Sequence, residues 1–170
     1  RPRGPFRERR DRSVEADGRV VSRSGDRRTD RWLFKSEPSE WSWDDQVARG
    51  ADGEVWDGVR NYQARNMMRA MKVGDLGFFY HSQKEKAVVG IVEVIAGSHP
   101  DPTSDDPRWD CVDIRAVRPF VRPVTLAEIR ETPALSEMAL LRNSRLSVQP
   151  VSSEEWDLIC RMGETDGGHG

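Results

Sequence analysis

The chain has 170 residues, with 27 basic and 29 acidic side chains and a formal net charge of −2. This balance argues against a histone-like protein that binds nucleic acid through its overall charge. No apolar run approaches the ~18 residues of a membrane span, and the first residues lack the apolar core of a secretory signal, so we expect an intracellular protein with no membrane partner.

The net charge is divided unevenly along the chain. Residues 1–30 carry ten arginines and six acidic residues (+4), whereas residues 31–170 carry 17 basic and 23 acidic residues (−6). The first segment has too few large apolar side chains to offset the entropy of ordering it. We therefore expect a disordered Arg-rich tail at 1–30, one domain at 31–163 and a second disordered tail at 164–170. An alternative role for the first tail is a weak phosphate-tracking arm.

The first half of the domain predicts two strands and two helices. Residues 31–35 alternate between apolar and polar, and residues 76–80 form an apolar run that follows a Gly-Asp turn; both predict strands. A capping box at 42–45 predicts the start of a short helix. Residues 62–71 predict a helix whose methionines pack inward.

The second half predicts three more strands and three short helices. Gly90 is expected at a bulge or a close approach inside its strand. Capping boxes at 125–128 and 152–155 start two of the helices. The strands are expected at 87–96, 109–118 and 146–151, and the helices at 126–131, about 136–141 and 153–162. Strands separated by unequal helices and loops favour an α+β fold with a curved or closed sheet.

Signatures of catalysis or metal binding are absent from the sequence. The two cysteines and three histidines have no metal-ligand spacing, and two cysteines make no disulfide framework. No Walker loop, G-x-G-x-x-G, H-E-x-x-H or G-x-S-x-G occurs. We therefore expect no metal, no cofactor and no catalytic residue, and we interpret Cys111 as a half-buried strand residue.

Four segments place polar side chains directly after an apolar strand or beside aromatic residues: 35–38, 56–62, 79–82 and 145–150. Asn offers a donor and an acceptor, which suits a nucleobase edge, whereas Arg suits a phosphate. The pattern predicts a pocket for a flat, polar ligand. One stacked base contributes only about 1–3 kcal/mol, so contacts to the nucleic-acid backbone would be needed as well.

The six tryptophans are a compositional excess in so short a chain. Trp56 lies outside any periodic pattern, beside Gly58, and we predict that it contacts the ligand. The other five are predicted to pack in the core: Trp32, Trp41, Trp43, Trp109 and Trp156.

Four motifs in one order carry a resemblance to a known family. They are W-L-F-K-S-E-P at 32–38, W-D-G-V-R-N-Y-Q-A-R-N at 56–66, F-F-Y-H-S at 78–82 and R-L-S-V-Q-P at 145–150. Together they make residues 31–163 resemble the EVE domain family of the PUA-like superfamily, which is similar to the YTH readers of methylated RNA. The resemblance implies a small β-barrel of about five or six strands with short peripheral helices.

The resemblance also implies a binding site without catalysis. The implied ligand-binding residues are Lys35, Ser36, Glu37, Trp56, Arg60, Asn61, Tyr80, His81, Ser82, Arg145, Leu146 and Ser147. Trp56 and Tyr80 would be the aromatic walls, Ser36, Asn61 and Ser147 would contact base edges, and Lys35, Arg60 and Arg145 would meet a phosphate or an exocyclic oxygen. The acidic stretch at 101–107 argues against a nucleic-acid contact from that loop.

The leading hypothesis is a non-catalytic reader of modified nucleic acid, with a modified cytosine such as 5-methylcytosine or 5-hydroxymethylcytosine flipped out of DNA into the pocket. The expected location is the bacterial cytoplasm and nucleoid, or the nucleus of a eukaryote. Alternatives are an RNA-binding PUA-like module, or an enzyme acting on a nucleobase or nucleotide with His81, Glu37 and Lys35 as acid–base groups. A module for a protein partner is a third.

Overall fold

The computed structural model describes residues 30–167. Of the predicted tails, residues 1–29 and 168–170 lie outside the described residues, whereas Asp30 and residues 164–167 are described. In the described part the strands are β1 (Arg31–Ser36), β2 (Glu54–Trp56), β3 (Leu76–His81), β4 (Ala87–Pro100), β5 (Asp110–Thr125) and β6 (Val148–Val151). The α-helices are α1 (Trp43–Ala48), α2 (Tyr62–Ala70), α3 (Leu126–Arg130), α4 (Ala139–Arg142) and α5 (Ser153–Met162), with 3₁₀ turns at Gly50–Asp52, Gln83–Glu85 and Pro133–Leu135.

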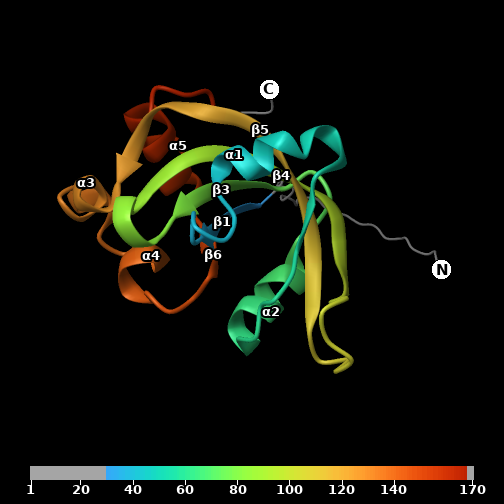
Figure 1. Ribbon diagram of the computed structural model, residues 1–170. Helices are drawn as coiled ribbons and strands as arrows, with labels where there is room; N and C mark the ends of the chain where they lie inside the picture. Colours follow the sequence, from blue (N-terminus) through green and yellow to red (C-terminus); the bar gives the residue numbers. More distant parts are fainter. Residues whose placement is uncertain (1–29, 168–170) are drawn as a thin grey trace, which may run out of the picture.

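The strands form one six-stranded mixed sheet in the order β2-β5-β4-β3-β1-β6. β1 and β3 are parallel, and the other neighbours are antiparallel. Register shifts along β4 and β5 mark bulges, which bend a sheet. Figure 1 shows this long pair crossing the domain from α3 to the β4–β5 turn. The predicted α+β fold is confirmed, and within residues 30–167 the sheet stays open, with β2 and β6 at its edges.

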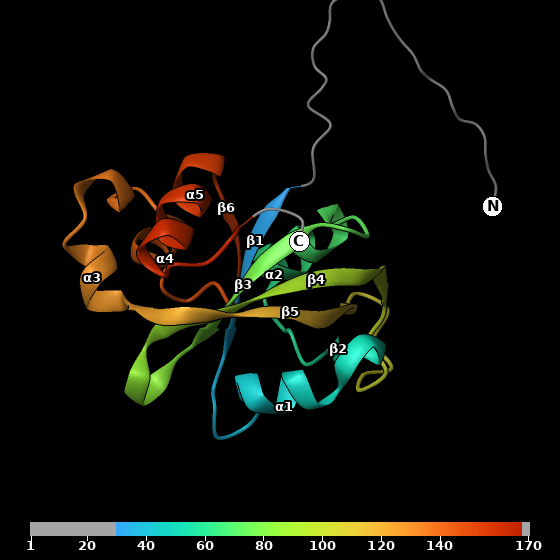
Figure 2. The same cartoon turned by 90° about the horizontal axis from the view of Figure 1, so that it is seen from above.

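The sheet buries both of its faces. Because side chains alternate along a strand, Leu33 and Phe78 enter one apolar cluster with Trp156 of α5, whereas Phe34 and Phe79 enter a second cluster with residues of α1 and α2. Figure 2 shows α1 on one side of the β4–β5 pair and α4 and α5 on the other. This double burial explains why β1 and β3 carry consecutive apolar residues.

Local sequence signals are confirmed at the helix starts. All three predicted capping boxes form, at Ser42, Thr125 and Ser152, each with reciprocal hydrogen bonds. Gly90 lies at a register shift, and a Cβ on it would fall 2.4 Å from the ring of Trp43. The three-residue strand β2 was not predicted, because it is too short to show an alternating pattern.

No helix within residues 30–167 combines the length and the apolar character that a membrane span needs.

Candidate nucleic-acid interface

A cavity of about 440 Å³ opens where the end of β1 meets β2. These strands are far apart in the sheet order, yet the rings of Phe34 and Trp56 lie 5.4 Å apart, so the curvature of the sheet brings β2 over β1. The volume is within the range of small-ligand pockets and suits a single nucleobase. Its lining residues are Lys35, Ser36, Glu37, Glu40, Trp41, Glu54, Val55, Trp56, Asp57, Gly58, Val59, Arg60 and Ser147.

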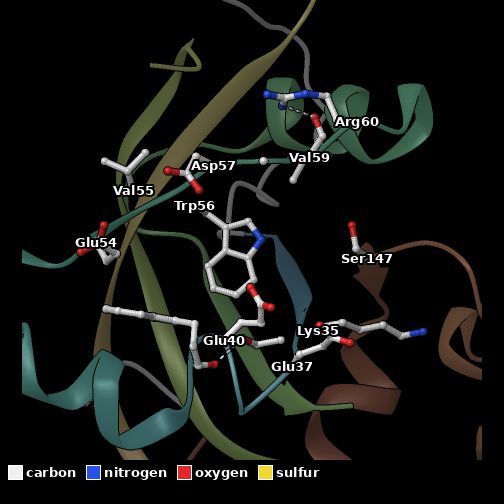
Figure 3. A pocket seen from close by; sticks show the side chains of 13 residues that line it. Lys35, Glu37, Glu40, Glu54, Val55, Trp56, Asp57, Val59, Arg60 and Ser147 are labelled. Atoms are coloured by element: carbon white, nitrogen blue, oxygen red, sulfur yellow. Dashed lines mark hydrogen bonds between the residues drawn. The ribbon is translucent and has the colours of Figure 1, made fainter. Parts of the chain in front are cut away.

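Trp56 joins the cavity to the core. Its ring makes edge-to-face contacts with Phe34 at 5.4 Å and with Phe79 at 5.9 Å, and it is half-buried. Figure 3 shows the indole at the centre of the lining side chains. The core therefore fixes the orientation of an aromatic surface that remains open to a ligand.

Trp41 is a second aromatic residue of the cavity lining. Its Nε1 donates to Oε1 of Gln46 at 2.9 Å, and the amide of this buried Gln46 donates to the carbonyl oxygen of Ile114 at 3.1 Å. Trp41 thus packs against the apolar cluster that contains Phe34 and Phe79, as predicted, and also contributes to the cavity.

The loop after β2 is held by a buried carboxylate. The Asp101 side chain is fully buried, and its Oδ2 accepts from the backbone N–H of Gly58 at 2.8 Å and from Nη1 of Arg60 at 3.0 Å. Burial alone would raise the pKa of Asp101, but hydrogen bonds from Thr103, Gly58 and Arg60 outweigh it and hold the pKa at about 2. Asp101 therefore stays ionised and pairs with Arg60.

The cavity lining is rich in hydrogen-bond acceptors. Four of its residues are acidic: Glu37, Glu40, Glu54 and Asp57. Burial, followed by the neighbouring Asp101 and Glu54 carboxylates, raises the pKa of Asp57. Carboxylates accept hydrogen bonds from an exocyclic amino group such as that of cytosine. The arrangement can bind a donor-bearing base edge and disfavours a phosphate inside the cavity.

Lys35 lines the cavity, but its charged end lies outside it. The ammonium donates to the backbone carbonyl of Ser144 at 2.6 Å, and burial lowers the pKa of the group. Figure 3 shows this nitrogen pointing away from Trp56.

The structure brings together half of the residues that the sequence predicted for the site. Those around the cavity are Lys35, Ser36, Glu37, Trp56, Arg60 and Ser147. Outside its lining are Asn61, Tyr80, His81, Ser82, Arg145 and Leu146.

Three of the residues outside the lining have structural partners. Asn61 caps α2, since its Oδ1 accepts from the N–H of Ala64 at 2.9 Å. Nε2 of His81 accepts from the N–H of Trp43 at 3.0 Å. Leu146 is buried in the core.

The other three point elsewhere. Tyr80 and Ser82 line a second cavity together with Lys35, and Arg145 is exposed outside both linings. Alternation along β3 explains Tyr80, because its side chain shares the face of Phe78, opposite to that of Phe79.

Seven lining residues were not predicted: Glu40, Trp41, Glu54, Val55, Asp57, Gly58 and Val59. The motif W-D-G-V-R does contain three of them, so that signal was present in the sequence. The others lie in β2 or in the loop after β1, where no periodic pattern indicates which side chains point inward.

Residues 30–167 contain neither a candidate metal site nor a reactive cysteine thiol. Among residues 30–167 no group of three or more His, Cys, Asp or Glu side chains could hold a metal ion. Both cysteines are buried and unpaired, and burial raises the pKa of Cys111 and of Cys160 to about 12. Both thiols are therefore protonated at neutral pH.

The fold and the aromatic cavity define the class of protein. The structure is similar to that of the YTH domain of Mmi1, with a TM-score of 0.52 at 16% sequence identity; the match covers 79% of this chain and 88% of that one. The chain thus has the PUA-like fold that the YTH domains share. The EVE domain pattern matches residues 30–162, so the chain belongs to the EVE domain family.

Relatives across bacteria and animals support this assignment. Mouse thymocyte nuclear protein 1 is 37% identical over 167 residues, covering 79% of this chain and 74% of that protein. A crystal structure from Agrobacterium tumefaciens is 58% identical with a TM-score of 0.79, covering 80% of this chain and 94% of its own. Human THYN1, solved in complex with DNA containing 5-methylcytosine, is 35% identical with a TM-score of 0.74. The match covers 81% of this chain and 99% of the THYN1 chain. The predicted resemblance is confirmed.

Proposed function

We propose that this chain is a non-catalytic reader of modified DNA, which binds a flipped modified cytosine in the cavity around Trp56. The observation that carries the proposal is the placement of Trp56, which packs in T-shaped contacts against Phe34 and Phe79 while the residue lines a base-sized cavity. The solved complex of human THYN1 with DNA containing 5-methylcytosine supports the choice of a modified cytosine in DNA as the ligand.

The chemistry of the lining suits a cytosine. The indole of Trp56 provides a stacking surface worth about 1–3 kcal/mol. The carboxylates around it accept from the exocyclic N4 amino group. Val55 and Val59 provide apolar surface that can contact a 5-methyl substituent. Stacking and hydrogen bonding then favour a base that has left the duplex.

The positions of the candidate acid–base groups favour binding over catalysis. His81 uses Nε2 to accept from the backbone of Trp43, and Lys35 uses its ammonium to donate to Ser144. The charged or basic atoms of these two groups do not face the cavity in which a base would react. The third candidate, Glu37, does line the cavity, and its carboxylate accepts from the amide of Gln83 at 2.7 Å. A reader of DNA must share a compartment with DNA, so the proposal includes a nuclear or nucleoid location.

Oligonucleotide binding tests the proposal. Duplexes with cytosine, 5-methylcytosine or 5-hydroxymethylcytosine at one position, and the matching RNAs, are compared at one fixed salt concentration. We expect the tightest binding to a duplex with a modified cytosine, and no change in the mass of the base after long incubation. Equal affinity for all the oligonucleotides would overturn the reader, and a mass change would identify an enzyme.

A further inference from the structure

A second cavity, of about 360 Å³, lies on the other side of Lys35. It is bounded by the end of β3, the turn after it, and parts of α3 and α4. Its lining residues are Lys35, Tyr80, Ser82, Gln83, Lys86, Leu126, Arg130, Leu140, Leu141 and Ser144.

The charge of this cavity is opposite to that of the first. Three lining residues are cationic, Lys35, Lys86 and Arg130, and none is acidic. Two carboxylates lie near the turn that follows β3. Glu37 accepts from the amide of Gln83 at 2.7 Å, and Oε1 of Glu85 lies 3.7 Å from Nδ1 of His81. Neither is part of the lining.

The three cations also differ from most arginines of the domain. Within residues 30–167, no carboxylate lies at ion-pair distance from Lys35, Lys86 or Arg130. By contrast, 2.5–3.0 Å separates a carboxylate oxygen from each of Arg49, Arg60, Arg69, Arg108, Arg115, Arg122 and Arg142. Lys86 and Arg130 are exposed at the rim of the cavity, and Lys35 is half-buried in its wall. Cations that gather around one cavity without carboxylate partners favour an anionic ligand.

Neutral donors complete the cavity. The lining residues Tyr80, Ser82 and Ser144 carry hydroxyl groups, and Gln83 carries an amide. The Ser82 hydroxyl also donates to the carbonyl oxygen of Ser36 at 3.3 Å, and the Gln83 amide donates to Glu37 at 2.7 Å. Tyr80 is almost fully buried, and no hydrogen bond from its hydroxyl to another described residue occurs. A phosphate oxygen accepts from such donors as well as from ammonium and guanidinium groups.

The turn after β3 has unusual backbone angles. Gln83 has a φ of +71° and Lys86 a φ of +26°, values that residues other than glycine rarely adopt. The conformation is held by the N–H of Leu126, which donates to the carbonyl of Lys86 at 2.8 Å. Both residues line the cavity, and strained backbone of this kind concentrates at binding sites.

One wall separates the two cavities. Lys35 lines both; its backbone N–H donates to Ser147 at 2.9 Å and its ammonium donates to Ser144 at 2.6 Å. Ser147 belongs to the first cavity and Ser144 to the second. A nucleotide with its base in the first cavity would therefore place a neighbouring backbone phosphate close to the second.

We infer that the second cavity binds a backbone phosphate of the nucleic-acid strand whose base occupies the first cavity. This inference rests on the proposed function. The first cavity then supplies discrimination between bases, and the second supplies the electrostatic attraction that an acidic domain otherwise lacks.

The test uses Lys86→Gln, Arg130→Gln and the double variant, with Lys84→Gln as the matched control. Lys84 lies in the same turn and is exposed, but it does not line the cavity. Binding to a methylated and an unmethylated DNA duplex is measured between about 50 and 200 mM salt. We expect the double variant to bind both duplexes more weakly by the same factor, with a salt slope smaller by about 1 for each lost phosphate contact. Lys84→Gln leaves the slope unchanged.

Three results would overturn the inference. The first is a double variant with wild-type melting temperature, affinity and salt slope. The second is a loss of the methylation preference at an unchanged slope, which would assign the cavity to base recognition. The third concerns cytidine monophosphate added as a competitor of DNA. If the double variant bound DNA as the wild type does but cytidine monophosphate no longer displaced that DNA, the cavity would be a site for a free nucleotide. Failure of the proposed function is distinguishable, because it appears as a wild-type protein with no preference among bases, whatever the slopes are.

Discussion

The Asp101 carboxylate accepts a hydrogen bond from the backbone N–H of Gly58 at 2.8 Å, although the two residues belong to different loops of the domain. Gly58 has a φ of +78°, so the loop that lines the cavity turns at this residue. The same carboxylate accepts from the N–H of Thr103 at 2.7 Å. The acidic turn between β4 and β5 thus positions the cavity loop through an inward-facing carboxylate.

Replacement of this carboxylate is expected to destabilise the domain in a pH-dependent way. The pKa of Asp101 falls from an ordinary 3.8 to about 2 in the folded state, so the ionised form favours folding. The stabilisation is fully present above about pH 4 and is lost as the pH falls through about 2. Asp101→Asn should lower the free energy of unfolding by about 2 kcal/mol at pH 7.

Urea unfolding at several pH values measures this effect. The difference between wild type and Asp101→Asn should shrink as the pH falls below 4. Asp105→Asn is the control, because Asp105 is an exposed residue of the same turn and removes the same charge. A constant difference from pH 7 to pH 2 would contradict the ionic role of Asp101.

Trp56→Phe and Trp56→Ala separate the binding role of this residue from its packing role. Trp56→Ala removes the stacking surface and also two aromatic contacts, with Phe34 and Phe79, so it should destabilise the domain by about 1–3 kcal/mol. Trp56→Phe keeps an aromatic ring and should lose less stability. Both should reduce the preference for methylated over unmethylated DNA, Ala more than Phe, at an unchanged salt slope.

Fluorescence anisotropy measures the preference of the Trp56 variants for methylated DNA, and thermal melting measures their stability. If Trp56→Ala kept the full preference for methylated DNA, the aromatic surface would have no part in recognition. A large fall in melting temperature for Trp56→Phe would assign Trp56 mainly to the core.

The sequence predicts the fold better than it predicts the cavity, for physical reasons. Strands and capping boxes are local signals, because each depends on a few neighbouring residues. Gly90 is marked by a glycine inside an apolar strand, although the ring that it accommodates belongs to Trp43, far away in the sequence. The cavity depends on curvature that brings Trp56 of β2 over Phe34 of β1, and no local pattern encodes that contact. Tyr80 is the clearest example, since it lies beside the motif residues in sequence but on the opposite face of β3.

Gly90→Ala is expected to destabilise the domain through overpacking. A Cβ at this position would lie 2.4 Å from the ring of Trp43, which is itself packed at 5.4 Å against Phe79. Either the ring or the strand must move, at a cost of about 1–3 kcal/mol. Gly97→Ala is the matched control on β4, because a Cβ there meets nothing within 4 Å. Thermal melting should show a lower midpoint for Gly90→Ala and little change for Gly97→Ala; equal midpoints would contradict the close packing of Trp43.

Gln46 is expected to act on ligand binding through Trp41. Gln46→Leu removes the acceptor for the indole N–H of Trp41 and the donor to the carbonyl oxygen of Ile114, both within a buried or half-buried region. The unpaired groups should lower the free energy of unfolding by about 1–3 kcal/mol. Trp41 then loses its fixed orientation, so binding of methylated DNA should weaken at an unchanged salt slope.

A double-mutant cycle isolates the contact between Gln46 and Trp41. Trp41→Phe removes the indole N–H but keeps an aromatic ring, so part of the cost of Gln46→Leu disappears when both changes are combined. We expect a coupling free energy of about 0.5–3 kcal/mol in stability, measured by urea unfolding of the four proteins. The same cycle in DNA affinity should also be non-additive, because both residues then act on one wall of the cavity. Strictly additive effects in both measurements would mean that Gln46 stabilises the strand at Ile114 alone and has no part in orienting Trp41.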